Sequence, residues 1–302
     1  MIGIKAIASY IPEQAIDNIV QAQRFGESAE FVERKLGALH LPRKSKAEET
    51  SDMAVQAVKA LARKMSDLDL ADIDALVVVT QNGVGQGLPQ TVAAFGVSLG
   101  CSGYVYGLFL LQGFLHSSGL KNGILVTADP YSKIVNPDDR VTTLLFGDAA
   151  TATWLGEEPV WELEHVAYGT DGSGADFLRV ADNQLHMNGR QIFNFAALRV
   201  APHIEQLLNA HKLSSEDVDL YCLHQGSAAI FDAISRRFGN LADRFVKDMV
   251  WTGNTVSSSI PLLLERRAFG TPYQRILISG FGVGLSWASA TIKKISEGEK
   301  SC

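Results

Sequence analysis

The chain has 302 residues, of which 46% are hydrophobic and 20% charged, and its formal net charge is −6. This length and apolar content suffice for one large domain or two fused ones, and they exclude a disordered chain. The acidic balance, without a face rich in basic and aromatic residues, argues against nucleic acid as a partner. No apolar run is long enough to span a bilayer, so we expect no membrane insertion.

The three cysteines, Cys101, Cys222 and Cys302, are an odd and sparse set without CxxC spacing. This pattern argues against a disulfide framework and against a metal site, because both need clustered or paired cysteines. We therefore expect no metal and a reducing, cytoplasmic environment.

Basic residues gather in two segments of the chain. Each segment is either a solvated face or a docking site for an acidic partner, and the sequence favours neither reading. The first cluster contains Arg34, Lys35, Arg43, Lys44 and Lys46, and the second contains Arg236, Arg237, Arg244 and Lys247, interrupted by Asp243.

The first half of the chain alternates strand and helix patterns. We predict a strand over 2–10, a helix over 17–36, and a helix that begins at Thr50 or Ser51. The continuous apolar run 75–80 is typical of a buried central strand. After a glycine-rich loop at 83–87 and the segment of Cys101, the patterns predict a helix over 103–118, a buried strand over 123–129 and an apolar β-like stretch over 143–155.

The second half repeats this order. Residues 217–225 align by eye with residues 72–81, after a predicted helix over 196–212. A predicted helix over 257–269 and strands over 275–279 and 285–292 follow. We interpret the chain as two related α/β halves, 1–160 and 161–302, packed face to face around a shared cleft.

Cys101 is the candidate nucleophile. It lies between small residues where an apolar run changes to helical spacing, so its thiol should lie at a helix N-terminus, where the positive end of the helix dipole favours a thiolate. Taken alone, a cysteine in such a turn is more often a packing residue. A catalytic role for Cys101 therefore requires partner residues elsewhere in the chain.

His224 and Asn254 supply them. His224 follows the apolar strand of the second half, and Asn254 occupies in that half the place that Cys101 has in the first. A thiolate can attack a thioester carbonyl, an imidazole and a carboxamide can donate hydrogen bonds to a second carbonyl, and the backbone N–H groups of the 282–284 turn can hold an oxyanion. Duplication would bring all of these groups to one cleft.

These residues resemble the motifs of a known family, the β-ketoacyl-acyl-carrier-protein synthase III branch of the thiolase-like superfamily, over nearly the whole chain. The matching segments are 100–104 around the cysteine, 223–225 around the histidine, 253–255 around the asparagine, the glycine loop 281–284, and 139–140 with 146–148. The resemblance implies a layered αβαβα fold of two duplicated halves, a homodimer, acyl-CoA or acyl-carrier-protein thioesters as substrates, and no metal or organic cofactor.

The resemblance also implies a mechanism. Cys101 would take an acyl group from a thioester donor, and His224 and Asn254 would then stabilise the enolate formed when a malonyl-type thioester loses CO2. The N–H groups of Cys101 and of the turn at Gly282 and Val283 would hold the tetrahedral oxyanion. The implied substrate contacts are Phe31, Lys35, Arg140, Ser227 and Leu88.

Several positions depart from the family pattern. Where the family usually has Ala-Asn-x-Arg-Ile after the histidine motif, this chain has Gly-Ser-Ala-Ala-Ile at 226–230, and the Trp and Arg that flank the donor's adenine are Phe31 and Lys35. These changes leave donor and acceptor open. Two alternatives to condensation remain: transfer of the acyl group from Cys101 to an alcohol or amine in secondary metabolism, and a non-catalytic partner subunit.

Two stretches are shorter than in the family. Between Gln81 and Cys101, about three helical turns, or roughly 16 Å of helix, are missing from the pattern. A loop is also missing near 178–183. We expect omitted residues rather than true deletions, because loss of an interface strand from a buried sheet would leave backbone groups unpaired.

Overall fold

The first half of the chain forms five adjacent strands in a computed structural model that describes residues 1–82 and 92–296. β7 pairs antiparallel with β1 and β6, whereas β4 runs parallel to β6 and β5. The inner strands β4 and β6 are almost entirely apolar and buried, as strands covered on both faces must be. The strands are β1 (Ile2–Tyr10), β4 (Ala75–Val79), β5 (Ala93–Val97), β6 (Gly123–Ala128) and β7 (Ala150–Glu157).

The second half repeats this pairing. β13 pairs antiparallel with β8 and β12, and β12 runs parallel to β11. A single backbone pair, Ile4 with Trp161, joins the two halves into one strand order, β11-β12-β13-β8-β1-β7-β6-β4-β5, within the described residues. The strands are β8 (Trp161–Thr170), β11 (Leu220–Leu223), β12 (Arg275–Gly282) and β13 (Ser286–Lys294).

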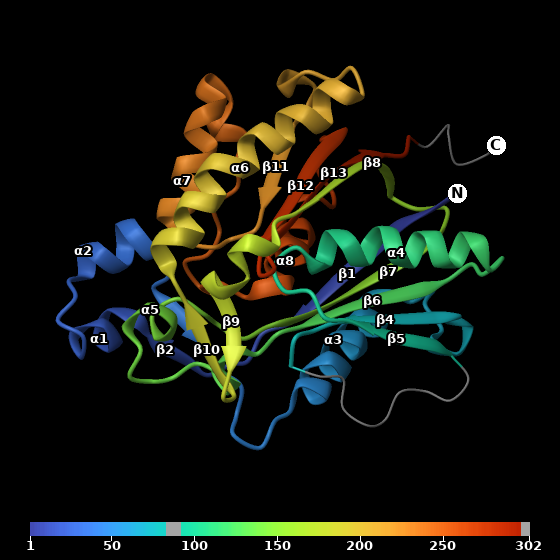
Figure 1. The fold of residues 1–302 in the computed structure, drawn as a ribbon. Coiled ribbons are helices and arrows are strands. Elements are labelled where there is room, and N and C mark those ends of the chain that lie inside the picture. The colour runs from blue at the N-terminus through green and yellow to red at the C-terminus, as the bar shows by residue number, and fades with distance from the viewer. Residues whose placement is uncertain (83–91, 297–302) are drawn as a thin grey trace.

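Helices separate and cover the two sets of strands, as Figure 1 shows. α4 and α8 lie between the halves, because each contacts strands of both, whereas α3 covers the outer face of the first half and α6 that of the second. This confirms the layered α/β fold. The larger helices are α3 (Thr50–Lys64), α4 (Gly103–Ser117), α6 (Gly189–Ala210), α7 (Ala228–Ser235) and α8 (Ser259–Arg267).

Each interface between layers has its own apolar core. α3 buries Met53, Ala57 and Leu61, spaced four residues apart along one helix face, against the first half. The central core surrounds Leu108 and Leu111 of α4, and a third core lies between α6 and the second half. The division of the chain at residue 160, just before β8, stays a prediction.

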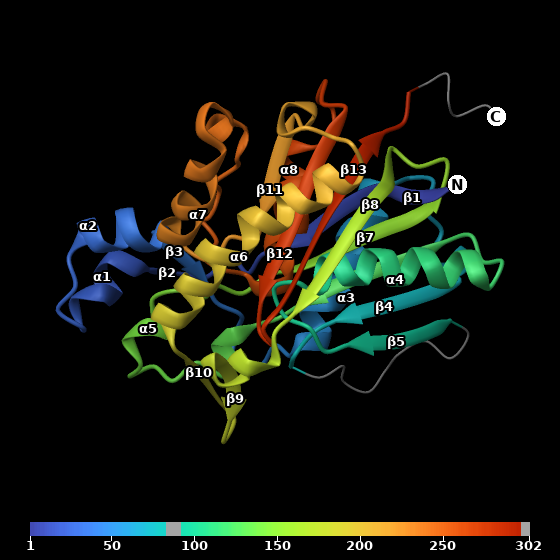
Figure 2. The ribbon, with the colours of Figure 1, turned by 45° about the horizontal axis from the view of Figure 1, so that its top comes forward.

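Smaller elements form one end of the molecule, visible around α1, α2 and α5 in Figure 2. The predicted helix 17–36 is wrong as one element, because Gly26 has a positive φ of 71° and ends its first part. These elements are β2 (Ala15–Asp17), α1 (Asn18–Gln23), α2 (Ala29–Phe31), a π-helical turn over Val32–Leu36, β3 (His40–Pro42) and α5 (Arg140–Thr143).

The short stretch near residue 180 forms a hairpin of β9 (Leu178–Ala181) and β10 (Gln184–Met187). Asp182 and Asn183 close it with positive φ angles of 52° and 58°, which suit a tight two-residue turn. The backbone pairing therefore continues through this stretch at its present length.

The reason given for omitted residues before Cys101 is wrong, since the interface strand is present as β5 and pairs along its length with β4. The glycine-rich loop predicted at 83–87 lies outside the described residues, so the missing helical turns stay a prediction. No helix within 1–82 or 92–296 is both long and apolar enough to cross a membrane.

Candidate active site

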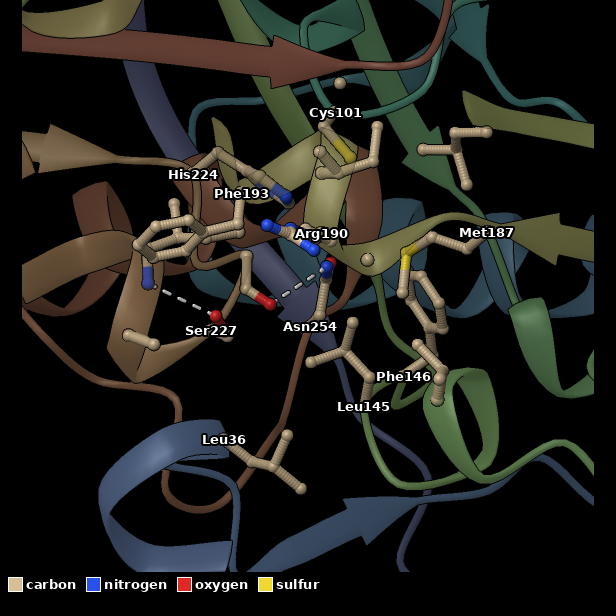
Figure 3. Close-up of a pocket in the computed structure, with 18 of the residues that line it drawn as sticks. Leu36, Cys101, Leu145, Phe146, Met187, Arg190, Phe193, His224, Ser227 and Asn254 are labelled. Carbon is tan, nitrogen blue, oxygen red and sulfur yellow. Dashed lines mark hydrogen bonds between the residues drawn. The ribbon is translucent and has the colours of Figure 1, made fainter. Parts of the chain in front are cut away.

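A cavity of about 370 Å³ lies between the two halves and the small elements at the end of the molecule. It runs from exposed side chains such as Arg140 and Arg190 to Cys101, which is only 5% exposed. Figure 3 shows Cys101, His224 and Asn254 on its wall. Most of the other lining side chains are apolar, including Leu36, Tyr131, Val141, Leu145, Phe146, Leu178, Met187, Ile192, Phe193, Ile230 and Phe281.

Cys101 lies in the turn between β5 and α4, two residues before the helix begins. The end of β12 packs directly on this turn. A Cβ on Gly280 would lie 2.4 Å from the carbonyl oxygen of Cys101, and a Cβ on Gly282 would lie 3.1 Å from Sγ. Only glycine permits the first approach, so the glycine loop and the nucleophile turn fit together through bare backbone.

The expected thiolate is not the resting form of Cys101. Burial raises the pKa of the thiol above its usual range, and the negative charge of the buried Asp129 raises it further. Cys101 does lie just before α4, but burial and the charge of Asp129 both oppose ionisation of its thiol there. Deprotonation therefore has to accompany attack on the substrate.

His224 is 3% exposed and follows β11. Its Nδ1 lies 2.7 Å from Oγ of Ser259, and that hydroxyl is also 3.0 Å from the carbonyl oxygen of Val256. The serine has one proton to donate. A carbonyl can only accept, so both contacts are hydrogen bonds when Oγ–H donates to Val256 and Nδ1–H donates to Oγ. If Oγ–H turns to Nδ1 instead, His224 carries its own proton on Nε2, the ring nitrogen left for the cavity.

Asn254 is held by contacts from both halves of the chain. Its N–H donates to the carbonyl oxygen of Leu145, and its own carbonyl accepts from the N–H of Gly147, each at 3.0 Å. The side-chain Oδ1 accepts from the N–H of Val256 at 2.9 Å. This leaves Nδ2 as the group that Asn254 offers to the cavity, with a long 3.4 Å contact to the carbonyl of Gly226.

Other predicted substrate contacts surround the exposed end. Phe31 and Arg140 both line the cavity, and the Arg140 guanidinium stands 5.7 Å from the centre of the Phe31 ring while it is hydrogen bonded to Glu27. Lys35 was predicted here but is exposed and does not line the cavity. Its neighbour Leu36 does, because the π-helical turn places that residue on the inner face.

Of the remaining predicted site residues, Ser227 lines the cavity and Val283 does not. Ser227 lines the cavity and caps α7, its Oγ accepting from the N–H of Ile230 at 3.3 Å. Val283 does not line the cavity, but its side chain lies against the turn of Cys101, since a Cβ on Gly100 would be 3.2 Å from it. Leu88 lies outside the described residues.

Several residues that line the cavity were not predicted from the sequence, including Tyr131, Met187 and Arg190. Asn188 was the sequence feature that could have located Met187 and Arg190. It caps α6 by accepting a hydrogen bond from the N–H of Gln191. An Asn before a helix is a common cap, so it could have placed the start of α6 at residue 189 rather than 196.

The residues of the first basic cluster do not form one basic surface, so that prediction is wrong. Arg43 is partly buried, donates to the carbonyl oxygens of Phe146 and Thr143, and has its pKa lowered by desolvation. No group of three or more His, Cys, Asp or Glu in the described part of the chain is arranged to hold a metal ion.

Burial lowers the pKa of His224 from 6.5 to about 3, so the folded protein keeps this imidazole neutral. Between these pH values the unfolded chain binds the extra proton, and acidification therefore destabilises the fold by up to about 1.4 kcal/mol per pH unit. We expect the free energy of unfolding of the wild type to fall more steeply than that of His224→Asn between pH 6.5 and 4.5.

Urea unfolding at a series of pH values measures both curves. Burial raises the pKa of Asp129 to about 6, so this group makes the fold more stable as the pH falls, opposite to His224. Both proteins contain Asp129, so its contribution cancels when the two free energies of unfolding are subtracted. Parallel curves would contradict a neutral, buried His224.

Comparison with known proteins agrees with this geometry. A family model described as 3-oxoacyl-[acyl-carrier-protein] synthase III matches residues 95–172, and a model for the C-terminal part of the same family matches residues 208–294. A β-ketoacyl-[acyl-carrier-protein] synthase III from Deinococcus deserti is 32% identical over 97% of this chain and 91% of its own length.

Solved structures give the same result. A crystal structure of a 3-oxoacyl-(acyl-carrier-protein) synthase III is 32% identical, with a TM-score of 0.89 over 97% of this chain and 99% of its own. The Thermus thermophilus enzyme of that name is 28% identical, with a TM-score of 0.87 over 96% and 98% of the two chains. On these similarities and motifs, the chain belongs to the 3-oxoacyl-acyl-carrier-protein synthase III family and has its thiolase-like fold.

Proposed function

We propose that this chain is a condensing enzyme that joins an acyl thioester to a malonyl-type thioester, as in the first elongation step of fatty acid synthesis. The observation that carries the proposal is the cavity wall itself, where a buried thiol, an imidazole and a carboxamide converge from both halves. The synthases among the relatives favour this activity over the two alternatives, acyl transfer to an alcohol or amine and a non-catalytic subunit.

In the first step, Sγ of Cys101 attacks the thioester carbonyl carbon of the donor. The carbon–sulfur bond of the donor breaks, the acyl group stays on Sγ, and the donor leaves as a thiol that takes the proton of Cys101. The N–H groups of Cys101 and of the turn at Gly282 and Val283 hold the oxyanion formed on the way, and one such donor is worth roughly 3 kcal/mol.

The second step uses His224 and Asn254. Nε2–H and Nδ2–H donate to the thioester oxygen of the malonyl-type substrate, CO2 leaves, and the electron pair of the broken bond passes into the enolate. The enolate carbon attacks the carbonyl of acyl-Cys101, and collapse of the oxyanion breaks the carbon–sulfur bond and releases the cysteine sulfur as a thiolate, which takes a proton from water to restore the thiol. Every group used is a side chain or backbone amide, so we propose that no metal or organic cofactor takes part.

The donor can be acyl-CoA or an acyl carrier protein. Exposed Arg236 and Arg237 at the C-terminal end of α7 are the part of the second basic cluster that suits an acidic carrier, since Arg244 and Lys247 are engaged by the Val218 carbonyl and Asp232. The sparse cysteines support a cytoplasmic location.

The proposal predicts a covalent acyl-enzyme. Incubation with an acyl-CoA should increase the intact mass of the chain by one acyl group, because Sγ of Cys101 is the nucleophile on the cavity wall. Cys101→Ala should show no increase, whereas Cys222→Ala, which removes the buried thiol of β11, should still be labelled. A wild type that stays unlabelled with every donor would instead support a non-catalytic subunit.

We also propose a homodimer that forms through β5. This strand is at the edge of the strand order in the described residues, and it is apolar and partly exposed. Native proteins normally cover such an edge strand. Phe95 of β5 packs on Phe114 of α4 with ring centres 5.5 Å apart, and Leu110 of the same helix is 47% exposed. A second copy placed edge to edge would bury this apolar face.

Phe95→Lys should therefore convert the dimer into a monomer, because a lysine at a strand edge opposes edge pairing. Light scattering after size exclusion would measure the mass, which is 32.7 kDa for one chain. Val180→Lys, on the exposed hairpin strand β9, is the matched control and should stay dimeric. A monomeric wild type, or a dimer that keeps its mass with Phe95→Lys, would refute this arrangement.

A further inference from the structure

Three consecutive buried serines, 257–259, follow the turn of Asn254. The hydroxyls of the first two bond to strands and loops of the first half of the chain. Ser259 differs from them, because its Oγ lies 2.7 Å from Nδ1 of His224. Its side chain does not line the cavity, so it can act on a substrate only through the imidazole. Ser259 is therefore a candidate positioning residue for His224.

Two groups lie beside His224 on the side away from the cavity, and they differ in what they can do. The Ser259 hydroxyl can donate or accept a hydrogen bond, whereas the carbonyl oxygen of Val256 can only accept. Burial lowers the pKa of His224, and a hydrogen bond to this carbonyl raises it. The carbonyl therefore favours a proton on Nδ1, which would leave Nε2 without a proton toward the cavity.

The second step of the proposed reaction needs the opposite arrangement. Nε2 has to carry the proton, because the thioester oxygen of the malonyl-type substrate can only accept. Nδ1 is then a buried acceptor, and leaving it without a donor is costly. Among the described residues, the Ser259 hydroxyl is the one group that both contacts Nδ1 and has a proton to give.

The backbone of Val256 holds both side chains of the second step. Its N–H donates to Oδ1 of Asn254 at 2.9 Å, and its carbonyl oxygen lies 3.0 Å from Oγ of Ser259. Its φ of 53° is in the left-handed region, which a β-branched residue rarely adopts, and its side chain is fully buried. Such conformations persist where the surroundings fix them, and they gather at functional sites. One rigid residue therefore sets the place of Asn254 and of Ser259.

We propose that Ser259 is a positioning residue for decarboxylation, because its hydroxyl turns from the Val256 carbonyl to Nδ1 of His224 and holds the imidazole with its proton on Nε2. This inference rests on the proposed condensation. The ring has one proton in either form, so the buried site gains no charge. Without the hydroxyl, the carbonyl would keep the proton on Nδ1, and the second step would lose one of its two donors.

Ser259→Ala separates the two steps of the reaction. Acylation of Cys101, followed by intact mass, should be unchanged, because it does not use His224, and it shows that the variant is folded. CO2 release from a malonyl thioester by the acylated enzyme should fall by about 100- to 1,000-fold, the effect of losing one donor to a developing oxyanion. Ser259→Thr keeps a hydroxyl and should recover most of the rate.

Nitrogen NMR of isotope-labelled histidine reports the position of the proton directly. The signal of His224 is identified by its absence in His224→Asn. The protein is bound to an amide analogue of the malonyl thioester, which keeps the carbonyl oxygen. The wild type should carry the proton on Nε2, and Ser259→Ala should carry it on Nδ1. The wild-type result remains informative if the alanine variant does not fold.

Ser258→Ala is the matched control. It removes a neighbouring buried hydroxyl, which lies 2.8 Å from Oγ1 of Thr127 and 3.1 Å from the carbonyl oxygen of Ala149. This variant should release CO2 at the wild-type rate, even if it is less stable. An equal loss in both alanine variants, a wild-type rate in Ser259→Ala, or a proton on Nδ1 in the wild type would overturn the inference while condensation stands. A wild type that releases no CO2 overturns the proposed condensation, and the NMR comparison still decides whether Ser259 sets the proton of His224.

Discussion

The backbone bridge between Asn254 and the loop of Leu145 and Gly147 is the contact on which the site depends. Two hydrogen bonds of 3.0 Å join a loop of the second half to a loop of the first. Gly147 makes the approach possible, since a Cβ there would lie 2.0 Å from the carbonyl oxygen of Thr252. Because the strands of the two halves that the structure describes pair at a single position, Ile4 with Trp161, this bridge holds their ends together where the cavity lies.

The polar groups of the same region are shielded from water, and this burial determines their protonation states. Burial keeps the thiol of Cys101 protonated and the imidazole of His224 neutral, so the resting site holds no ion pair between them. Its lowered pKa makes the imidazole of His224 a weak base, so it can donate a hydrogen bond without taking the thiol proton. Hydrogen bonds in such surroundings are stronger than in water, which favours stabilisation of charge that develops only during the reaction.

The sequence predicted best where one physical signal dominated. The strand β4 and the helix α4 were predicted to within one residue, because a continuous apolar run and a regular helical spacing leave little choice. The helix over 17–36 failed at Gly26, and α6 was placed too late because its first turn is polar. Local propensity is weak where tertiary packing decides.

The candidate site shows the same limit. Cys101, His224 and Asn254 could be found because the repeated order of elements places each at an equivalent turn, and the cavity brings them together. Tyr131 could not, because its place on the cavity wall is fixed by a hydrogen bond to Gln81, 50 residues earlier in the chain. Lys35 was carried over from the family pattern, and its role as a substrate contact stays a prediction, since its neighbour Leu36 is the residue that lines the cavity.

The central claim is that acyl transfer to Cys101 is followed by decarboxylative condensation, with His224 and Asn254 as the donors for the second step. The most direct measurement is the release of CO2 from a malonyl thioester by enzyme already acylated on Cys101. We predict one CO2 for each acyl group consumed, with loss of CO2 release but not of acylation in Asn254→Ala. Transfer of the acyl group to an alcohol or amine without CO2 would contradict the account.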